Sequence, residues 1–553
     1  MRLSGGMGER FVKRQHLITL AAAAAMAASL PGAVTAQAPA FAAEDGVPVW
    51  QSSVLNSANG VYIGPDGNVY AASVFGDEIT VQDPNTGEVL DRIGPERGVH
   101  GPDDVFVTDD GTVYWTEILG GNVGMLKPDG TFTVQQVAPG VNPITMSDDG
   151  RLFVSRVFMG DGLYELDPEL VEPPRVVIED LMGMNGMDFG PDGLLYGPLQ
   201  FGAAVVRVDV DAEEPVAEVV VDGLRVPTAV KFDSSGALHV VDLAEGQVLR
   251  IDLDSGERET LIDIDGTLDN MAFDADDRLF TVASAEGQVW RRDPDGQLTA
   301  INEAGFTAPA GVAVTDDGTL WAVGDLFVLR SFDAAGEPGT VIYDRFDPPG
   351  SVPTTGFTVS ADGNDLITTS WFGNYVQVFD PATNEVKQDI RTLAVPLNAI
   401  RHGDALVASQ GGLPEGNNVV DASTGEELIG GLVMPFGLAS DGETLYVADW
   451  ALGTVFAVPA EGDPVPLATE LAAPEGLALD GDRLLVVEQG LGQVSAIDLA
   501  TGEKTVVIEG LALGDRVIPG ALPHGNFNGV AVGPDGSIFV SVDGQNAVLE
   551  FAR

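Results

Sequence analysis

The chain has 553 residues, 44% of them hydrophobic, and it carries 84 Asp and Glu against 27 Lys and Arg, a formal net charge of −57. This is the composition of a folded protein that is too long for one ordinary core. The negative field excludes nucleic acid as a partner and favours cations or basic partners, although an adaptation to solubility or salt explains it as well. Cysteine is absent, which excludes disulfides and thiolate metal sites.

The N-terminal segment has the layout of an export signal. Three basic residues at positions 10, 13 and 14 precede the apolar run "LITLAAAAAMAASLPG", and small residues follow in "AVTAQA" and "AFAA". We expect cleavage after Ala36 or Ala42, so that residues 1–43 are a signal peptide and short linker. No later segment reaches the roughly 20 apolar residues of a membrane span. The sequence therefore predicts an exported protein, periplasmic or secreted.

One strand unit repeats along the rest of the chain. In "LMGMNGMDFGPDGLLYGPLQ", Asn185 heads an alternating strand and stands eight residues before the turn glycine Gly193. The same position recurs at intervals of 38 to 45 residues, with one interval of 53 before the last. The column of equivalent residues is Asn59, Asp103, Asn142, Asn185, Thr228, Asp269, Ala310, Thr355, Asn398, Phe436, Glu475 and Asn528. A second strand such as "NVYAAS", a third such as "YVQVFDP" and usually a fourth such as "TVVIEG" follow.

A four-stranded unit that repeats about every 42 residues is typical of a β-propeller blade. No segment between the strands has helical periodicity, which excludes a βαβ array. Propellers have roughly four to eight blades. The sequence therefore predicts an all-β fold of two six-bladed propellers, residues 44–306 and 307–553, and a single ring of twelve blades is the alternative. The chain stops before an outer strand of the last blade, and we expect "VPVWQSSVL" near the N-terminus to supply it.

The heads of the innermost strands in a propeller surround one axis. The first six units place an oxygen-bearing side chain at every head, and such oxygens are ligands for a divalent cation, Ca²⁺ or Mg²⁺. The candidate metal ligands of the first ring are Asn59, Asp103, Asn142, Asn185 and Asp269. The alternative is that these short polar side chains cap turns and hold water.

The second ring mixes polar and apolar residues at the same positions, which is more typical of a pocket for an organic ligand. Asn398, Glu475 and Asn528 are its candidate metal ligands, and Phe436 is a candidate ligand-binding residue. The long interval before Asn528 carries His524, a candidate general base, or else an exposed loop histidine with no role.

The loop after each second strand opens on the face that carries these heads. Its acidic, polar and aromatic residues are therefore candidates for ligand binding at the rim of each mouth. They are Glu117, Arg156, Gln200 and Asp242 in the first ring, and Trp371, Asp449, Trp450 and Glu488 in the second.

These motifs resemble the SMP-30/gluconolactonase and NHL-repeat group of six-bladed propellers. The resemblance implies a divalent metal held at strand heads by Glu, Asn and Asp. The similar positions are Asp103 in "GPDDVFV", Asn185 in "MNGMDFGPDG", Glu475 in "PEGLALD" and Asn528 in "FNGVAV". They are divided between the two rings, so neither ring reproduces the whole set. The second blade also resembles the repeats of streptogramin lyases, but His100 and His524 lie on different rings and do not form the histidine cluster of those enzymes.

Three functions are compatible with the predicted propellers and their candidate site residues. The first is an exported hydrolase of a lactone or ester, in which a metal polarises the carbonyl group and Asp103, Asp269, Glu475 or His524 relays protons. The second is a non-enzymatic scaffold whose mouths hold a small ligand, a peptide or a protein partner, and the third is a lyase. Propellers host all three, so the fold alone does not decide. A phosphate-cradling Gly-Lys motif and a "GxSxG" nucleophile elbow are both absent from the sequence.

Overall fold

The computed structural model describes residues 41–325, 328–346, 350, 352–413, 416–514 and 527–553. All of them belong to one compact unit, residues 39–553. Within these residues the chain forms β-strands and short 3₁₀ turns but no α-helix, and hence no helix that could span a membrane. The predicted signal segment up to residue 40, including Ala36, lies outside the described residues.

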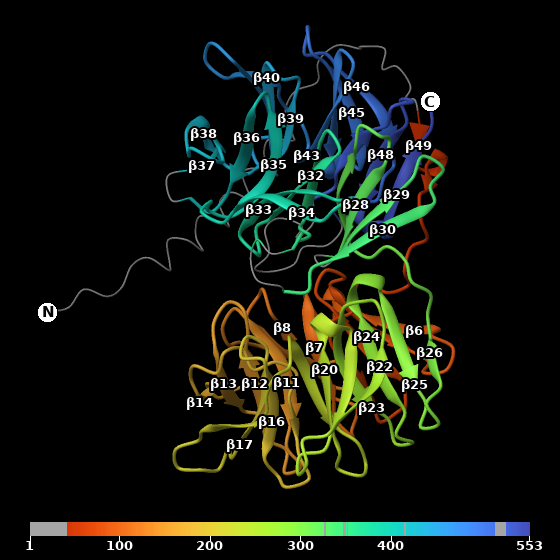
Figure 1. The fold of residues 1–553 in the computed structure, drawn as a ribbon, viewed down its shortest axis with the longest axis vertical. Coiled ribbons are helices and arrows are strands. Elements are labelled where there is room, and N and C mark those ends of the chain that lie inside the picture. Colours follow the sequence, from red (N-terminus) through yellow and green to blue (C-terminus); the bar gives the residue numbers. More distant parts are fainter. Residues whose placement is uncertain (1–40, 326–327, 347–349, 351, 414–415, 515–526) are drawn as a thin grey trace, which may run out of the picture. The chain divides into compact units, whose positions relative to one another are not determined.

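The described strands form eleven four-stranded sheets and one five-stranded sheet, and nearly all neighbouring strands are antiparallel and consecutive in the chain. The first six sheets, drawn red to yellow-green in Figure 1, are β3 (Val61–Ile63), β4 (Val69–Ser73), β5 (Glu78–Gln82) and β6 (Val89–Ile93); β7 (Pro102–Val107), β8 (Val113–Glu117), β9 (Asn122–Leu126) and β10 (Phe132–Gln136); β11 (Val141–Met146), β12 (Leu152–Arg156), β13 (Gly162–Leu166) and β14 (Arg175–Ile178); β15 (Asp188–Phe189), β16 (Leu195–Leu199), β17 (Ala204–Val208) and β18 (Ala217–Val221); β19 (Pro227–Phe232), β20 (Leu238–Asp242), β21 (Gln247–Ile251) and β22 (Arg258–Asp263); and β23 (Leu268–Phe273), β24 (Leu279–Ala283), β25 (Gln288–Arg292) and β26 (Leu298–Ala300).

The other six sheets contain the C-terminal strands, drawn green to blue, and two short strands from the N-terminal end, drawn red. They are β27 (Pro309–Val314), β28 (Leu320–Gly324), β29 (Val328–Phe332) and β30 (Pro338–Tyr343); β31 (Thr358–Asp362), β32 (Asp365–Ser370), β33 (Tyr375–Asp380) and β34 (Glu385–Ile390); β35 (Pro396–His402), β36 (Ala405–Gln410), β37 (Asn417–Asp421) and β38 (Glu427–Leu432); β39 (Pro435–Ser440), β40 (Thr444–Asp449), β41 (Thr454–Pro459) and β42 (Val465–Ala468); β43 (Pro474–Asp480), β44 (Arg483–Glu488), β45 (Gln493–Asp498), β46 (Lys504–Glu509) and β1 (Phe41–Ala42); and β47 (Val530–Val532), β48 (Ile538–Val542), β49 (Ala547–Phe551) and β2 (Val47–Pro48). The 3₁₀ turns are η1 (Ala43–Asp45), η2 (Pro95–Arg97), η3 (Leu243–Glu245), η4 (Ser284–Glu286), η5 (Gln489–Leu491) and η6 (Asp543–Gln545).

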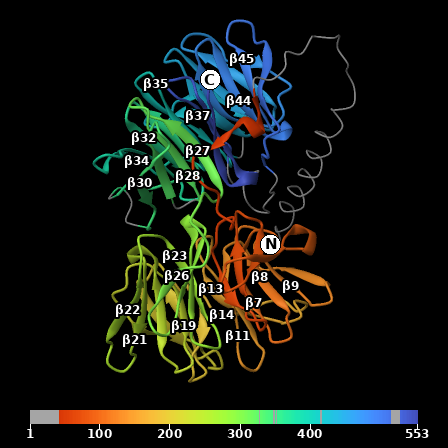
Figure 2. The ribbon, with the colours of Figure 1, turned by 90° about the vertical axis from the view of Figure 1, so that its right-hand side faces the viewer.

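The innermost strands of these sheets contact one another in two closed cycles. One cycle runs β3, β7, β11, β15, β19, β23 and back to β3, and the other runs β27, β31, β35, β39, β43, β47 and back to β27. Apolar residues fill the space between neighbouring sheets, as Trp115 and Phe153 do with no exposed surface. The predicted all-β fold of four-stranded propeller units is confirmed, and the two groups of sheets are visible in Figures 1 and 2.

The glycine that follows many column residues has a packing reason. A Cβ atom on Gly186 would lie 2.8 Å from Cβ of Ala229, and one on Gly476 would lie 2.7 Å from the carbonyl oxygen of Asn528. Neighbouring inner strands come close at these points, and the Gly476 N–H donates to the Asn528 carbonyl at 3.1 Å. The "NG" and "EG" pairs therefore let the strand heads converge at the axis, because only glycine leaves room for the next backbone.

The N-terminal strand completes the last sheet, as the sequence predicted. Val47 and Pro48 of β2 pair antiparallel with Glu550 and Leu549 of β49. Preceding it, β1 adds a fifth strand, parallel to β46, to the sheet before. The sequence did not reveal β1, which has only two residues.

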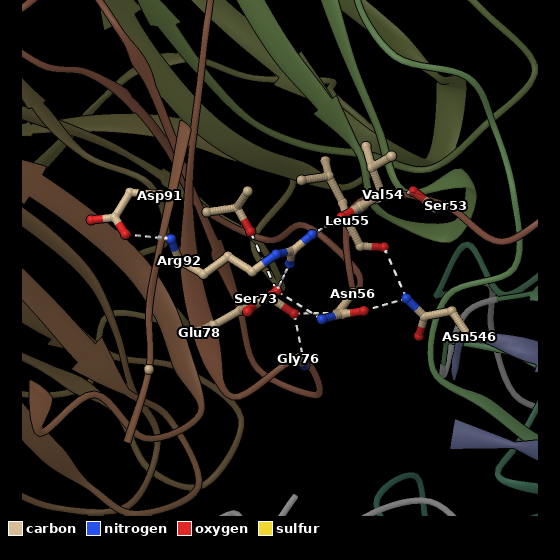
Figure 3. A network of polar contacts seen from close by, with 12 residues as sticks. Ser53, Val54, Leu55, Asn56, Ser73, Gly76, Glu78, Asp91, Arg92 and Asn546 are labelled. Carbon is tan, nitrogen blue, oxygen red and sulfur yellow. Dashed lines mark hydrogen bonds and ion pairs between the residues drawn. The ribbon is translucent and has the colours of Figure 1, made fainter. Parts of the chain in front are cut away.

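Two chain segments cross side by side between the two groups of sheets. The Ser53 N–H donates to the Phe306 carbonyl, and the Phe306 N–H donates to the Gln51 carbonyl, both at 2.9 Å. Figure 3 shows the polar network around Asn56, which follows the first crossing segment. The Asn56 side chain donates to Glu78 of the first ring at 2.7 Å and accepts a hydrogen bond from Asn546 of the second. The crossing segments are thus tied to both rings.

Candidate functional site

The predicted column residues of the first ring converge on one cavity. Each stands at the head of an inner strand, where the converging strands point it toward the axis. Asn59, Asp103, Asn142, Asn185 and Asp269 all line a cavity of about 60 Å³, together with the predicted rim residue Gln200. Thr228 does not line it, and its hydroxyl group donates to the backbone carbonyl of Asp269 at 2.6 Å. The space is sufficient for a few water molecules or one hydrated ion.

Amide side chains organise the polar wall of this cavity. The Asn59 side chain donates to the Asp269 carboxyl group and accepts the Val74 N–H at 3.3 Å. Asn185 donates to Gln200 Oε1 at 3.0 Å, and its own oxygen accepts the Gly186 N–H at 2.9 Å. Hydrogen bonds therefore fix the orientation of both amides, and the amide oxygens are partly occupied before any ligand binds.

Two carboxyl groups line the same cavity, that of buried Asp103 and that of half-buried Asp269. Burial raises the pKa of Asp269 to about 7, against the lowering effect of the Asn59 hydrogen bond. Burial, with repulsion from Asp269 and Asp104, holds the pKa of Asp103 well above its usual range. None of the described residues that line the cavity is cationic. Both carboxyl groups therefore lack a positively charged neighbour in the described lining, and a proton or a cation would relieve their repulsion.

Apolar side chains from both rings close the cavity. Phe75, Ile118, Leu119, Phe158 and Leu243 come from the first ring, and Phe346 and Phe372 come from the second. The Phe158 ring lies 5.9 Å from Phe346 and 5.6 Å from Phe372, measured between centroids. These aromatic rings pack over the polar wall and reduce the access of bulk water to the carboxyl groups.

The second ring has a larger axial channel, of about 310 Å³. Of its column residues, Asn398, Phe436, Glu475 and Asn528 line the channel. Ala310 packs instead between the sheets. Burial is the main cause that raises the pKa of Glu475 to about 8. The channel brings the predicted residues of the second ring together but does not join them to those of the first.

Four predicted rim carboxylates brace their own sheets. Asp242 accepts the backbone N–H groups of Arg225 and Val226 at 2.8 and 2.9 Å, and Asp449 accepts those of Val433 and Met434 at 2.7 and 3.1 Å. Each of these residues ends a second strand, where its carboxylate ties down the loop that enters the first strand. These side chains therefore line neither cavity.

The carboxylates of Glu117 and Glu488 also have hydrogen-bond partners. Glu117 accepts from Trp115 Nε1 at 3.1 Å and from Asn122 Nδ2 at 2.6 Å. Glu488 accepts the Ala472 N–H at 3.0 Å and pairs with Lys504 at 3.2 Å. The sequence predicted that both residues lie at the mouth. Their carboxylates, however, accept hydrogen bonds from neighbouring side chains and backbone groups.

The remaining predicted residues have packing roles or fall outside the described chain. Arg156 donates to the carbonyl groups of Pro139 and Met159 at 3.0 and 2.8 Å. Trp371 stacks on Phe357 with centroids 4.9 Å apart, and Trp450 packs against the apolar cluster of Phe436. The candidate base His524 lies outside the described residues.

The donor sets of the two rings fit a cation unequally. Among the described residues, no three Asp, Glu or His side chains form a metal-binding group. The first ring nevertheless offers the carboxyl groups of Asp103 and Asp269 and the Asn142 amide, for which no side-chain hydrogen bond occurs within the described residues, and hard cations take such oxygens. In the second ring, the amide oxygens of Asn398 and Asn528 accept the N–H groups of Ala399 and Asp543, at 2.8 and 3.1 Å. Only the carboxyl group of Glu475 then remains among the candidate ligands of the second ring, so this ring is the poorer cation site.

The apolar side chains that close the first-ring cavity were not predicted from the sequence. Phe75 in "SVFGDE", Ile118 in "TEILGG" and Phe158 in "RVFMGD" stand in the loops after the second strands, beside the polar residues that were chosen. Large apolar residues at consecutive loop tips were the available signal, since such residues need a partner surface. Nothing in the sequence indicated that Phe346 and Phe372 would supply it.

The fold and this enclosed, oxygen-rich cavity define a β-propeller protein with a buried polar site at one strand-head mouth. Residues 100–323 match the family model of the SMP-30/gluconolactonase/LRE-like region. Among solved structures, a streptogramin B lyase is 17% identical, with a TM-score of 0.38, over 50% of this chain and 94% of that one. The virginiamycin B lyase from Staphylococcus aureus is 15% identical, with a TM-score of 0.36, over 50% and 95%. None of the curated proteins compared with this chain matches it.

Proposed function

We propose that this is an exported protein whose first ring binds a divalent cation, Ca²⁺ or Mg²⁺, and hydrolyses a lactone or similar ester at that site. The observation that carries the proposal is that buried Asp103 and half-buried Asp269 line one cavity with no cationic side chain among the described residues around it. A bound cation would relieve their mutual repulsion. The family-model match over residues 100–323 supports the reaction class.

The side chains that line the cavity would have different roles in such a site. Asp103 and Asp269 would hold the cation, with Asn142 as a further oxygen ligand. When bound, a divalent cation supplies polarisation of a carbonyl group and a lowered pKa of water. Without a cation the pKa of Asp269 is raised to about 7, and a bound cation would lower it, so that the carboxylate serves as a ligand at neutral pH. Asn185 holds Gln200 in place, and the phenylalanines exclude water.

The first test measures cation binding and its effect on stability. The purified protein should contain Ca²⁺ or Mg²⁺ by elemental analysis, and a chelator should lower its melting temperature. Restoring the cation at a hundredfold excess over its dissociation constant should stabilise the protein by about 2.7 kcal/mol. Asp103→Asn and Asp269→Asn should lose this response, whereas Asp254→Asn, at an exposed turn of the same ring, should keep it.

The second test measures hydrolysis. We expect five- and six-membered lactones to release acid in a pH-stat with the cation present, and the two Asn variants to lose at least tenfold in rate. A wild type that contains no metal and is insensitive to chelator contradicts the cation site. A protein that binds the cation but hydrolyses none of the lactones contradicts the reaction class alone.

One observation favours a second candidate, a non-enzymatic scaffold. The cavity holds about 60 Å³ under an apolar cover supplied by both rings, which is far less than the few hundred Å³ of a typical small-molecule site. A cation in so small a space would stabilise the fold without turning over a substrate. Under this alternative, Phe372→Ala should widen the cavity without producing lactone hydrolysis.

A further inference from the structure

A short segment of the second ring reaches across to the cavity of the first ring. This segment, residues 343–346, is called the strap, and it begins at the last residue of β30. Phe346 in the strap is one of the residues that line the first-ring cavity. It also packs against Val226, Leu243 and Ala244 of the first ring. A side chain of the second ring therefore forms part of the wall of a first-ring cavity.

Polar contacts fix the strap to the first ring. Arg345 Nη2 pairs with Asp265 at 2.7 Å, and Arg345 Nη1 donates to the Ala244 carbonyl at 3.3 Å. The Tyr343 hydroxyl group donates to Glu286 Oε1 at 2.6 Å. Both ends of the strap are thus held by groups that belong to the first ring.

The contact at Glu286 is the stronger of the two. Its Oε1 also pairs with Arg330 of the second ring at 2.7 Å, and both side chains are only 11% exposed. The Arg330 guanidinium in turn lies 4.8 Å from the ring centre of Trp50. Breaking a buried pair is costly because it leaves a charge without a partner, whereas an exposed pair breaks readily. Since the Asp265 side chain is 87% exposed, its pair with Arg345 is the weaker attachment.

The two aromatic residues that meet over the cavity both have a left-handed backbone. The φ angle is +67° at Phe158 and +57° at Phe346, and their ring centroids are 5.9 Å apart. Bulky residues rarely adopt this conformation, and it persists only where the surrounding contacts impose it. The closed position of Phe346 therefore depends on the contacts of the strap.

We propose that the second ring is the lid of the first-ring cavity and that the strap is the part of the lid that opens. When the pair of Arg345 and Asp265 breaks, Phe346 leaves the cavity and admits a small solute, while the contacts of Glu286 keep the two rings together. This lid controls access to the cavity, and it requires neither the cation nor the ester hydrolysis proposed for that site.

Access to the cavity is measured with a single thiol, because the chain contains no cysteine. Ser284 lines the cavity and is 1% exposed, and Ser284→Cys exchanges one oxygen atom for sulfur. Its alkylation by iodoacetamide, an uncharged reagent, is followed by mass spectrometry on the full chain. Ser255→Cys, at an exposed turn of the same ring, gives the rate of an accessible thiol. We expect the thiol at position 284 to react at least a hundredfold more slowly than the thiol at position 255.

Variants of the strap test whether it controls that rate. In the Ser284→Cys background, Arg345→Ala and Phe346→Ala should each raise the alkylation rate at least tenfold. Asp265→Ala should act as Arg345→Ala does, and the two together should have no larger effect than either alone, because they break the same pair. Arg250→Ala is the matched control, since it removes an ion pair on the first-ring surface and should leave the rate unchanged.

A further variant separates opening of the strap from unfolding. Leu163 is fully buried in the first ring, so Leu163→Ala lowers stability without touching the strap. Below its own melting transition it should leave the alkylation rate at position 284 unchanged. Equal rates at positions 284 and 255 before any change to the strap, no acceleration in Phe346→Ala, or the same acceleration in Leu163→Ala as in Arg345→Ala would each overturn the proposal.

Discussion

At Asp269, burial and hydrogen bonding act on one carboxyl group in opposite directions. Burial raises its pKa to about 7, and the Asn59 hydrogen bond offsets only part of that effect. The unfolded chain has the ordinary value of 3.8, so the folded state binds the proton more tightly. The contribution of this proton to stability is complete below pH 3.8 and is lost as the pH rises through 7.

We therefore expect the cation-free protein to lose stability between pH 3.8 and about pH 7, with Asp269 contributing a slope of up to about 1.4 kcal/mol per pH unit. Asp269→Asn should have a shallower slope because it removes one titrating group, and Asp254→Asn serves as the control. Thermal melting in chelator at four pH values measures the slopes. Equal slopes for wild type and Asp269→Asn would show that this carboxyl group is ionised in the folded protein.

At the scale of elements, the N-terminal segment does more than complete a sheet. After β2, Trp50 packs edge-on against Phe306 with centroids 5.4 Å apart, and the Arg330 guanidinium lies 4.8 Å from its ring centre. Both the pairing of β2 and the crossing beside Phe306 place this segment in the second ring. The sequence predicted the pairing from a missing outer strand, but the tryptophan contact depends on tertiary structure.

Trp50→Ala should lower the free energy of unfolding by about 2–3 kcal/mol, since it removes a half-buried aromatic side chain from this contact. Val47→Ala is the matched control, because that side chain in β2 is 63% exposed and should cost less than about 0.5 kcal/mol. Urea denaturation followed by circular dichroism measures both variants. If they unfold at the same urea concentration, the segment is held by backbone pairing alone.

At the scale of the whole molecule, charge opposes compactness. A formal charge of −57 on 553 residues produces self-repulsion that salt screens, with a Debye length of about 8 Å at 0.15 M. Many of the acidic side chains occupy exposed turns, as Asp109 and Asp110 do. Their repulsion is spread over the surface and belongs to no single contact.

Raising NaCl from 0.02 to 1 M should therefore raise the melting temperature. A gain of about 2 kcal/mol corresponds to roughly 4–8 °C for domains of this size. Choline chloride should act equally if screening is the cause, whereas a response to Na⁺ alone would indicate a specific ion site. A melting temperature that does not change with either salt would mean that the surface charges are already compensated in the folded state.

The sequence by itself determined the strands, their grouping in fours and the polar residues at the strand heads, because alternation, turn glycines and repeat spacing are local properties. It also indicated that Asn59, Asp103, Asn142, Asn185 and Asp269 share one mouth, since equivalent positions in a closed repeat lie around one axis. The boundary between the rings at residues 306 and 307 stays a prediction.

Only the tertiary structure decided which of those side chains remain available to a ligand. Asp242 and Asp449 have the residue type and the position expected of a ligand-binding group. Their carboxylates, however, accept hydrogen bonds from backbone N–H groups of neighbouring loops. Phe346 and Phe372 close a cavity that belongs to a distant part of the chain. Hydrogen-bond satisfaction and burial depend on three-dimensional neighbours, and a repeat pattern describes only what its members have in common.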